Sequence, residues 1–343
     1  MNQPDRDHTT VTGESWLQAA QQAVVSQHPH IQSMLQANPS WTDQLLIPQR
    51  VTIETFFGCN AHCTMCVIDF PTHRRKGVMS MELFYKIVDG LLPYRDQIEM
   101  MDLTALGEPL LDKYLFERIR HLKQNGFRRL AFATNADLLS EDKQQALLES
   151  GIDTVMFSID GFCKETHEAI RVGVDYDRVV NHCLSTIARR NAGNYSTRFL
   201  VRFVRQEANR GEWEAYRHFW RQNIVPERGD QISCYDMHTW GGQVGSRQEM
   251  VNDPFPEEIA LEPCHHIFRK LTILADGSLA LCSEDLLTAQ FNLANVREQD
   301  PIAAFNAPRL QAMRALHLSG QKNRLKICSE CTILYCERKR VIE

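Results

Sequence analysis

The sequence predicts an α/β protein whose parallel sheet curls towards a barrel and is followed by a small cysteine-rich region. Six short apolar or β-branched runs alternate with longer amphipathic segments between residues 51 and 237. This alternation is typical of parallel strands joined by helices. Beyond residue 254 the pattern changes to short strands and cysteines, which indicates a second region with a different kind of core.

The individual elements follow from local periodicity. Strands are predicted at 51–57, 98–106, 128–135, 153–160, 197–204 and 230–237, and the clearest helices at 81–92, 113–126 and 176–191. Ser140 is placed to cap a further helix and Gly151 to end it. Together these elements predict a partial (β/α)6 TIM-like barrel over 48–253. A helical N-terminal extension over 1–47 precedes it, and a cysteine-rich domain over 254–343 follows it.

Composition and charge exclude several classes of protein. Of the 343 residues, 43% are hydrophobic and 24% charged, and the formal net charge is -5. A weakly acidic chain gives no reason to expect nucleic acid or an acidic membrane as partner. No run approaches the roughly 20 apolar residues of a membrane-spanning helix, and the first ten residues lack the basic and apolar segments of a secretion signal. We therefore expect a cytoplasmic protein.

The eleven cysteines are unevenly distributed, and in a reducing compartment clustered cysteines more often hold metal than form disulfides. Cys59, Cys63 and Cys66 follow the first predicted strand with the spacing C-x3-C-x2-C. Three thiolates on one short loop can hold three irons of a cubane cluster and leave the fourth open. A structural zinc site needs a fourth ligand, which this loop does not supply.

With this triplet after its first strand, the sequence resembles the radical S-adenosylmethionine (radical SAM) superfamily over about residues 50–240. The resemblance implies that Cys59, Cys63 and Cys66 hold a [4Fe-4S] cluster whose open iron binds S-adenosylmethionine. It also implies that the cofactor is reductively cleaved to a 5′-deoxyadenosyl radical that abstracts hydrogen. A reducing partner such as flavodoxin or ferredoxin is implied as well.

Further motifs match that superfamily in order and placement. Gly107 and Glu108 belong to a GEP motif, which implies contact with the methionine amino group. Ser158 and Asp160, at the end of the fourth strand, match positions that meet the ribose hydroxyls. Asn135 occupies a turn that is often TNG in the superfamily but reads TNA here, so either a cofactor contact or a structural turn is open.

Two more side chains complete the cofactor site implied by the resemblance. Alternation along the strand 197–204 puts Arg202 on the face opposite Phe203, and an arginine inside a barrel needs an anion such as the methionine carboxylate. A structural ion pair is the alternative. Met65 stands where many members have an aromatic residue against the adenine, and its polarizable sulfur suits a similar contact.

The C-terminal cysteines resemble a twitch-type auxiliary cluster module, the shortened form of the SPASM domain. A hairpin with an Asp-Gly turn is predicted at 273–282, which ends at the second of these cysteines. The resemblance implies that one auxiliary [4Fe-4S] cluster is held by Cys264, Cys282, Cys328 and Cys331. A zinc ribbon from the same cysteines is the alternative, and Cys336 could replace one of the ligands.

The reaction is less constrained than the cofactor. We expect a small-molecule substrate, resembling a sugar or an aminocyclitol, rather than a peptide. Hydrogen abstraction would lead to oxidation, with His238 as the base, or to epimerisation, with Cys234 as the hydrogen donor. A buried strand cysteine and a structural loop around His238 and Trp240 are the simpler interpretations. The run 73–76 is expected to form a solvated cationic face.

Two other function classes compete with this interpretation. A peptide- or protein-modifying radical SAM maturase would use the same cofactors on a larger substrate. A zinc-stabilised binding protein would use the cysteines only for structure, and it would be expected to carry a basic surface. The acidic balance and the strand–helix alternation argue against the binding protein.

Overall fold

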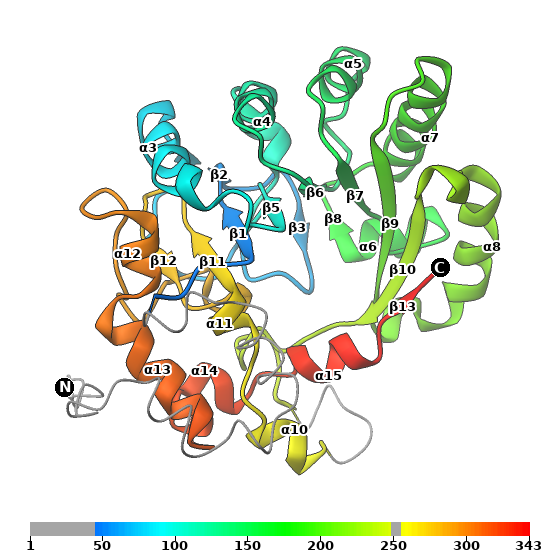
Figure 1. The fold of residues 1–343 in the computed structure, drawn as a ribbon. Coiled ribbons are helices and arrows are strands. Elements are labelled where there is room, and N and C mark those ends of the chain that lie inside the picture. Colours follow the sequence, from blue (N-terminus) through cyan, green and yellow to red (C-terminus); the bar gives the residue numbers. More distant parts are fainter. Residues whose placement is uncertain (1–44, 248–254) are drawn as a thin grey trace.

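The computed structural model describes residues 45–247 and 255–343 (Figure 1). The helical extension predicted over 1–47 therefore falls almost wholly outside the described residues. No helix within the described ranges is both long enough and apolar enough to cross a lipid bilayer.

The six predicted strands lie side by side in one parallel sheet, which confirms the predicted α/β fold. They are β1 (Arg50–Ile53), β5 (Met100–Asp102), β6 (Leu130–Thr134), β7 (Thr154–Ser158), β9 (Arg198–Arg205) and β10 (Gln231–Asp236). The predicted strand 51–57 is interrupted, because β2 (Phe56–Phe57) leaves the sheet to pair with β4 (Gly77–Val78). Beyond it, β3 (His62–Cys63) pairs with β8 (Arg171–Val172).

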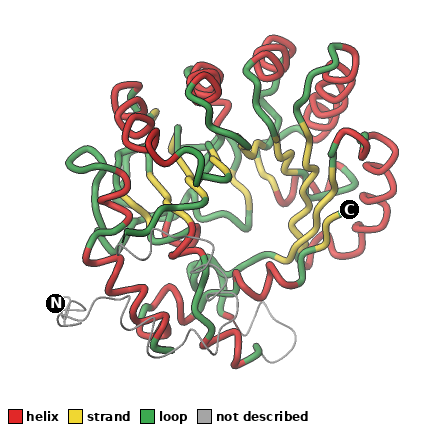
Figure 2. The backbone as a smooth tube through the Cα atoms, viewed as in Figure 1, coloured by secondary structure: helices red, strands yellow, loops and turns green. Residues whose placement is uncertain are grey.

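Helices follow the outer side of the curved sheet (Figures 1 and 2). They are α3 (Met81–Leu91), α4 (Leu115–Gln124), α5 (Glu141–Glu149), α7 (Tyr176–Ala192) and α8 (Trp213–Asn223), with the short α6 (Lys164–Ile170) after β7. Ser140 occupies the predicted N-cap position of α5, but its side chain makes no capping hydrogen bond. Gly151 follows the helix with a φ of 80°, a conformation in which glycine avoids the strain of a side chain.

The C-terminal region extends the same sheet at both edges. β11 (Lys270–Ile273) runs parallel to β1, and β12 (Leu279–Ala280) pairs antiparallel with β11, which confirms the predicted hairpin. β13 (Val341–Ile342) pairs antiparallel with β10. Among the described residues after 254, the α-helices are α10 (Glu257–Leu261), α11 (His266–Arg269), α12 (Pro301–Phe305), α13 (Pro308–Leu318), α14 (Lys326–Ser329) and α15 (Ile333–Arg338). The division at residue 254 stays a prediction, since strands on both sides of it share one sheet.

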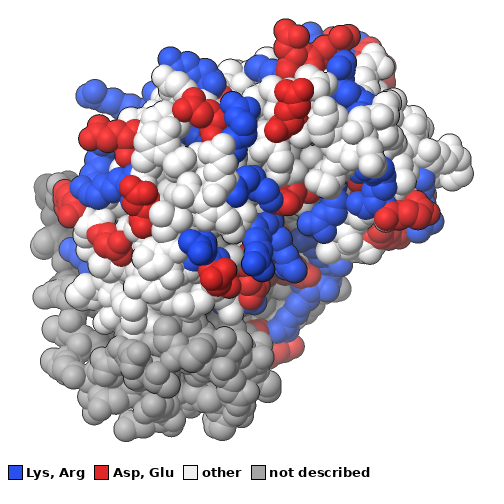
Figure 3. All heavy atoms as spheres, turned by 45° about the horizontal axis from the view of Figure 1, so that its top comes forward, with Lys and Arg blue, Asp and Glu red and all other residues white. Residues whose placement is uncertain are grey.

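Charged residues cover the helical face without forming a patch of one sign. Figure 3 shows Lys and Arg interspersed with Asp and Glu over this face. The expectation of a solvated cationic run at 73–76 is wrong for Arg74, which is buried and pairs with the buried carboxylate of Glu54. Burying a charged side chain without a partner of opposite charge is strongly destabilising. Arg74 can therefore turn inward only because Glu54 is there to pair with it.

Candidate active site and second cysteine site

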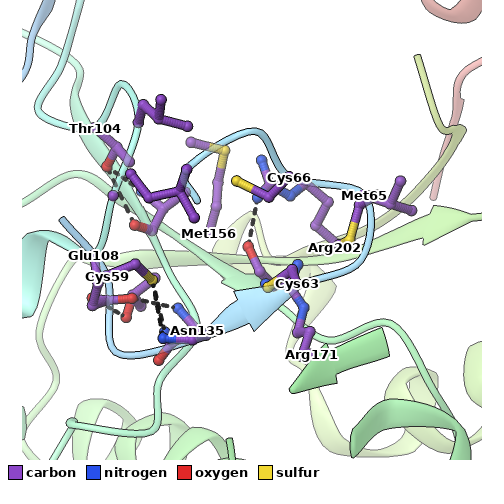
Figure 4. A pocket seen from close by; sticks show the side chains of 18 of the residues that line it. Cys59, Cys63, Met65, Cys66, Thr104, Glu108, Asn135, Met156, Arg171 and Arg202 are labelled. Carbon is purple, nitrogen blue, oxygen red and sulfur yellow. Dashed lines mark hydrogen bonds between the residues drawn. The ribbon is translucent and has the colours of Figure 1, made fainter. Parts of the chain in front are cut away.

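The carboxyl ends of the parallel strands surround a cavity of about 250 Å³ (Figure 4). This is the edge at which α/β barrels collect their ligands, because the loops that follow the strands converge there. Most of the cofactor-site residues predicted from the sequence line it: Cys59, Cys63, Met65, Cys66, Gly107, Glu108, Asn135, Ser158 and Arg202, together with His238. Arg171, Tyr235 and Trp240 line it as well.

The three cysteines of the first motif lie on one loop at the cavity wall. Pairing of β3 with β8 sets Cys63 directly opposite Arg171, whose guanidinium lies 3.7 Å from the Cys63 Sγ. The Cys66 N–H donates to the Cys63 carbonyl at 3.0 Å, and the Ala61 N–H approaches the Cys59 Sγ at 3.4 Å. The loop is therefore folded so that three sulfur atoms face one space.

These thiols are protonated unless a metal replaces the proton. Burial raises the pKa of Cys59 to about 12 and that of Cys66 to about 11. Burial also raises the pKa of Cys63, and the positive charge of Arg171 opposes that rise. Because iron binds the thiolate form, cluster assembly at this loop must release protons. Three partly buried thiols, with no fourth cysteine among the described residues that line the cavity, fit a cubane cluster with one open iron.

The GEP motif ties the end of the second strand to the cysteine loop. Gly107 has a φ of 142° and forms a bridge with Gly58, and a Cβ at Gly107 would lie only 2.5 Å from the Gly58 carbonyl oxygen. No larger residue fits this approach without a shift of the backbone. The next residue, Glu108, donates its N–H to the same carbonyl at 2.9 Å.

The Glu108 carboxylate is almost fully buried and organises the turn after β6. It accepts hydrogen bonds from the Thr134 hydroxyl at 2.7 Å and from the Asn135 N–H at 2.8 Å. Asn135 in turn donates to the Asn60 side chain at 3.0 Å, and its amide nitrogen lies 3.9 Å from the Cys59 Sγ. Glu108 and Asn135 thus hold the cysteine loop as well as facing the cavity.

The residues predicted for the ribose separate into two kinds of position. Ser158 lines the cavity and accepts a 2.5 Å hydrogen bond from Arg202. Asp160 is fully buried and is not part of the described cavity lining. Its carboxylate accepts the Val204 N–H at 2.7 Å and pairs with Arg171 at 2.6 Å. Asp160 therefore fixes Arg171 at the wall.

The loop after β10 joins the cavity to the C-terminal region. The indole N–H of Trp240 donates to the carbonyl of Met65 at 2.8 Å, which anchors the cysteine loop. The His238 Nδ1 lies 3.0 Å from a carboxylate oxygen of Glu284. Burial lowers the pKa of His238, but the Glu284 charge and hydrogen bond outweigh it and hold the pKa above the ordinary value.

Cys234 lies outside this arrangement. It is buried in the hydrophobic core, while Tyr235, its neighbour on β10, lines the cavity. Burial raises the pKa of the Cys234 thiol to about 11. This placement matches the simpler interpretation, a buried strand cysteine, and the structure does not bring the thiol together with His238.

A second pocket gathers the four C-terminal cysteines that the twitch resemblance implied. Cys264, Cys282, Cys328 and Cys331 line it together, and burial raises the pKa of all four thiols. Within the described residues all eleven cysteines are free thiols. Four converging thiols, one buried and three partly buried, suit a metal or an iron–sulfur cluster, which would replace their protons.

Cys336 is set apart from that group of four. Its Sγ lies 3.8 Å from the Met237 carbonyl oxygen and 3.9 Å from the Thr332 hydroxyl. It is not among the residues that line the described second pocket. The geometry therefore favours the four-cysteine set over one that includes Cys336.

Sequence reasoning missed several polar residues of the two sites. Arg171 reaches the cavity through the pairing of β8 with β3, and Glu284, His317 and Lys322 line the second pocket. Burial lowers the pKa of His317 to about 3. Of these four residues, only Glu284 could have been found from the sequence, because it lies two positions after Cys282.

Comparison with known families agrees with the two cysteine sites. Residues 53–185 match the model of the radical SAM superfamily, and residues 264–332 match SPASM, an iron–sulfur cluster-binding domain. These families imply a [4Fe-4S] cluster with S-adenosylmethionine and auxiliary iron–sulfur binding. The two matched ranges contain the seven cysteines grouped above.

One curated relative is the tungsten-containing aldehyde ferredoxin oxidoreductase cofactor-modifying protein of Pyrococcus furiosus. It is 34% identical over 110 residues, which cover 32% of this chain and 30% of the relative. The chain spans less than half the length of the curated relatives it matches first.

Two solved structures share the fold. BtrN in complex with AdoMet and 2-DOIA superposes with a TM-score of 0.55 at 17% identity, over 83% of this chain and 93% of that one. SuiB of Streptococcus suis bound to the precursor peptide SuiA superposes with a TM-score of 0.56 at 14% identity, over 78% of this chain and 66% of that one. At these identities the likeness concerns the fold.

Proposed function

Because the chain belongs to the radical SAM superfamily and carries a SPASM-type domain, we propose that it oxidises a small molecule at a carbon that bears a hydroxyl or an amine. Cys59, Cys63 and Cys66 would hold the first cluster, and Cys264, Cys282, Cys328 and Cys331 an auxiliary one. When bound, these groups and S-adenosylmethionine supply a 5′-deoxyadenosyl radical and a one-electron acceptor.

The observation that carries this proposal is the pair formed by His238 and Glu284. His238 lines the first cavity, Glu284 lines the second pocket, and their side chains meet at 3.0 Å. A substrate carbon that has lost its hydrogen atom becomes a carbonyl when its hydroxyl loses one proton and the carbon loses one electron. His238 is placed to take that proton on Nε2, since its Nδ1 faces Glu284.

Glu284 positions the ring and stabilises the charge that His238 gains. Its carboxylate is 1% exposed, so the attraction between the two groups is weakly screened. His238, supported by Glu284, therefore acts as a proton acceptor in the part of the first cavity that lies next to the second pocket.

Oxidation is favoured over epimerisation by the surroundings of Cys234. Inversion needs a hydrogen donor in the cavity, and the Cys234 thiol lies in the core instead. Asp102 and Tyr235, from the ends of β5 and β10, line the cavity and supply polar groups of the kind that bind hydroxyls.

The test uses anaerobically purified protein reconstituted with iron and sulfide. It is given S-adenosylmethionine, a chemical reductant and a panel of polyols, aminocyclitols and sugars. We expect one 5′-deoxyadenosine and one carbonyl product per turnover, with deuterium moving from the substrate carbon into 5′-deoxyadenosine. Turnover on peptides alone, with no polyol or sugar oxidised, would replace this proposal with the peptide-modifying alternative.

The variant His238→Gln tests whether His238 acts as the base. His238→Gln keeps a polar side chain but cannot act as a base near neutral pH. We expect this variant to cleave S-adenosylmethionine and to accumulate little carbonyl product, a loss of about 10²- to 10⁴-fold. Carbonyl formation at the wild-type rate would remove His238 from the mechanism.

A further inference from the structure

The second cysteine pocket contains a buried histidine that the proposed reaction does not use. His317 lies on α13 and has no exposed surface. Its ring contacts two of the four clustered cysteines, one through each ring nitrogen. A buried polar ring with both nitrogens directed at candidate cluster ligands is placed to influence what those ligands hold.

The hydrogen-bond partners fix which nitrogen carries the proton. The backbone N–H of Cys264 lies 3.1 Å from the His317 Nδ1. A backbone N–H can only donate, so Nδ1 must be the acceptor and the ring hydrogen must sit on Nε2. The Nε2 atom lies 3.5 Å from the Cys328 Sγ, so the N–H of His317 points to that sulfur.

The positive charge of Lys322 acts in the same direction. Its ammonium lines the pocket and donates to the Ile259 carbonyl at 2.8 Å and to the Glu262 carbonyl at 2.6 Å. These two bonds hold the charge in place beside the cysteines. Glu284 carries the opposite charge in the same pocket, so the hydrogen bond from His317 and the charge of Lys322 both offset it.

We propose that His317 is a positioning residue that raises the reduction potential of an auxiliary cluster by donating its Nε2–H to the Cys328 sulfur. Reduction adds one electron to a site that already carries four thiolates. A hydrogen bond to sulfur stabilises the more negative state more strongly, which raises the potential. The hydrogen stays on Nε2 throughout, so one electron is gained and no proton is transferred from His317.

The inference rests on the proposed function in one respect, namely that Cys264, Cys282, Cys328 and Cys331 hold the second cluster. It does not depend on the substrate or on His238. A measurement of potential can therefore succeed or fail whether or not the protein oxidises a polyol.

Two substitutions divide the roles of the two ring nitrogens. His317→Asn places an amide near the Nδ1 position, where it can still accept the Cys264 N–H, but it cannot reach Cys328. His317→Gln extends a donor to the Nε2 position. Both are made in the full chain, alone and combined with alanine at Cys59, Cys63 and Cys66, so that iron signals in the combined variants come from the second site.

The readouts are iron per chain and the midpoint potential from an anaerobic EPR titration. We expect about four irons in each combined variant, since a cubane holds four. At a fixed potential, His317→Asn should lower the ratio of reduced to oxidised cluster about tenfold, which is about 59 mV for one electron. His317→Gln should stay close to the parent.

Equal potentials in the parent and His317→Asn would overturn the proposal, as would an equal fall in both variants. Loss of iron in both would also overturn it, because His317 would then be needed to build the site rather than to tune it. In the unsubstituted chain, pulsed EPR on protein with ¹⁵N-labelled histidine should show a nitrogen coupling at the reduced second cluster. Absence of that coupling contradicts the hydrogen bond directly.

Failure of the proposed function looks different. If the chain with wild-type His317 and alanines at the first motif binds zinc and no iron, the second pocket is a zinc site. The electron acceptor of the proposed reaction and the tuning role of His317 then fall together. If it holds about four irons but no substrate is oxidised, only the proposed reaction is affected.

Discussion

The two cysteine sites differ in how much free space lies beside their sulfur atoms. The first has three cysteines on a single loop and faces a cavity of about 250 Å³. The second draws four cysteines from segments between residues 264 and 331, and these converge in a smaller pocket. Three thiols beside an open space suit a group that must still bind something else, whereas four converging thiols suit a closed coordination sphere.

The polar neighbours of the two sites differ as well. In the first, Arg171 approaches the Cys63 sulfur and is itself held by the buried carboxylate of Asp160. In the second, the neutral ring of His317 approaches Cys328, and the charged Lys322 is bound to backbone carbonyls. The contrast is what we expect if the first site binds a charged ligand and the second holds a cluster that gains an electron while its surroundings stay fixed.

The largest effect should come from removing the first motif. Alanine at Cys59, Cys63 and Cys66 should abolish 5′-deoxyadenosine formation and lower iron from about eight per chain to about four, since each cubane holds four. The matching change at the second site, Cys328→Ala with Cys331→Ala, should remove the other four and spare S-adenosylmethionine binding. If either set of changes removes all the iron, the two sites are not independent.

A single methyl group at Gly107 should damage the first site alone. Gly107→Ala forces a Cβ to 2.5 Å from the Gly58 carbonyl oxygen at a φ of 142°, which costs about 1–3 kcal/mol of strain. Gly320→Ala is the control, because Gly320 also has a positive φ, of 72°, but nothing lies within 4 Å of its added Cβ. Chemical denaturation and iron content should show the larger loss in Gly107→Ala, and equal losses would show that the contact with Gly58 is unimportant.

The link between the sites should appear in the pH profile of product formation. His238 must be neutral to accept a proton, so the rate falls as pH drops through its pKa. Glu284 holds that pKa above the ordinary value, and Glu284→Gln removes the charge. We expect the acidic limb of kcat to move to lower pH in this variant. A limb at the wild-type position would mean that another group controls it.

The smallest effect should come from the indole of Trp240. Trp240→Phe keeps an aromatic ring beside His238 but removes the N–H that donates to Met65. The loss of one hydrogen bond costs about 0.5–1.5 kcal/mol. We expect a modest rise in KM for S-adenosylmethionine relative to the unsubstituted chain, with the iron content of the second site unchanged. An unchanged KM would show that the hydrogen bond to Met65 does not matter for cofactor binding.

Local patterns in the sequence were sufficient for much of this architecture. Apolar or β-branched runs predicted the six strands from β1 to β10 that lie in the parallel part of the sheet. The alternation along β9 put Arg202 towards the cavity while Phe203 entered the core. The spacing of Cys59, Cys63 and Cys66 placed them on one loop. These features depend on residues that are close in the chain, where periodicity and spacing carry the information.

The remainder depends on contacts between distant segments. Arg171 faces Cys63 only because β8 pairs with β3, and His238 meets Glu284 across 46 positions of sequence. Burial of Arg74 depends on Glu54, which nothing in the cationic run itself reveals. That β11 lies beside β1 in the sheet is likewise a matter of tertiary pairing. Periodicity and spacing within one sequence do not reveal which distant segments pair with each other.

The order in which the strands of the sheet are synthesised has a consequence for biosynthesis. The six central strands precede both strands that flank them, β11 beside β1 and β13 beside β10. During synthesis the β1 edge therefore stays unpaired until β11 has been made, and the β10 edge stays unpaired until residues 341–342 have been made. Such edges invite pairing with other chains. The protein should be most prone to aggregate as a nascent chain. Its yield should respond to chaperones and to slower synthesis more than the stability of the finished fold would suggest.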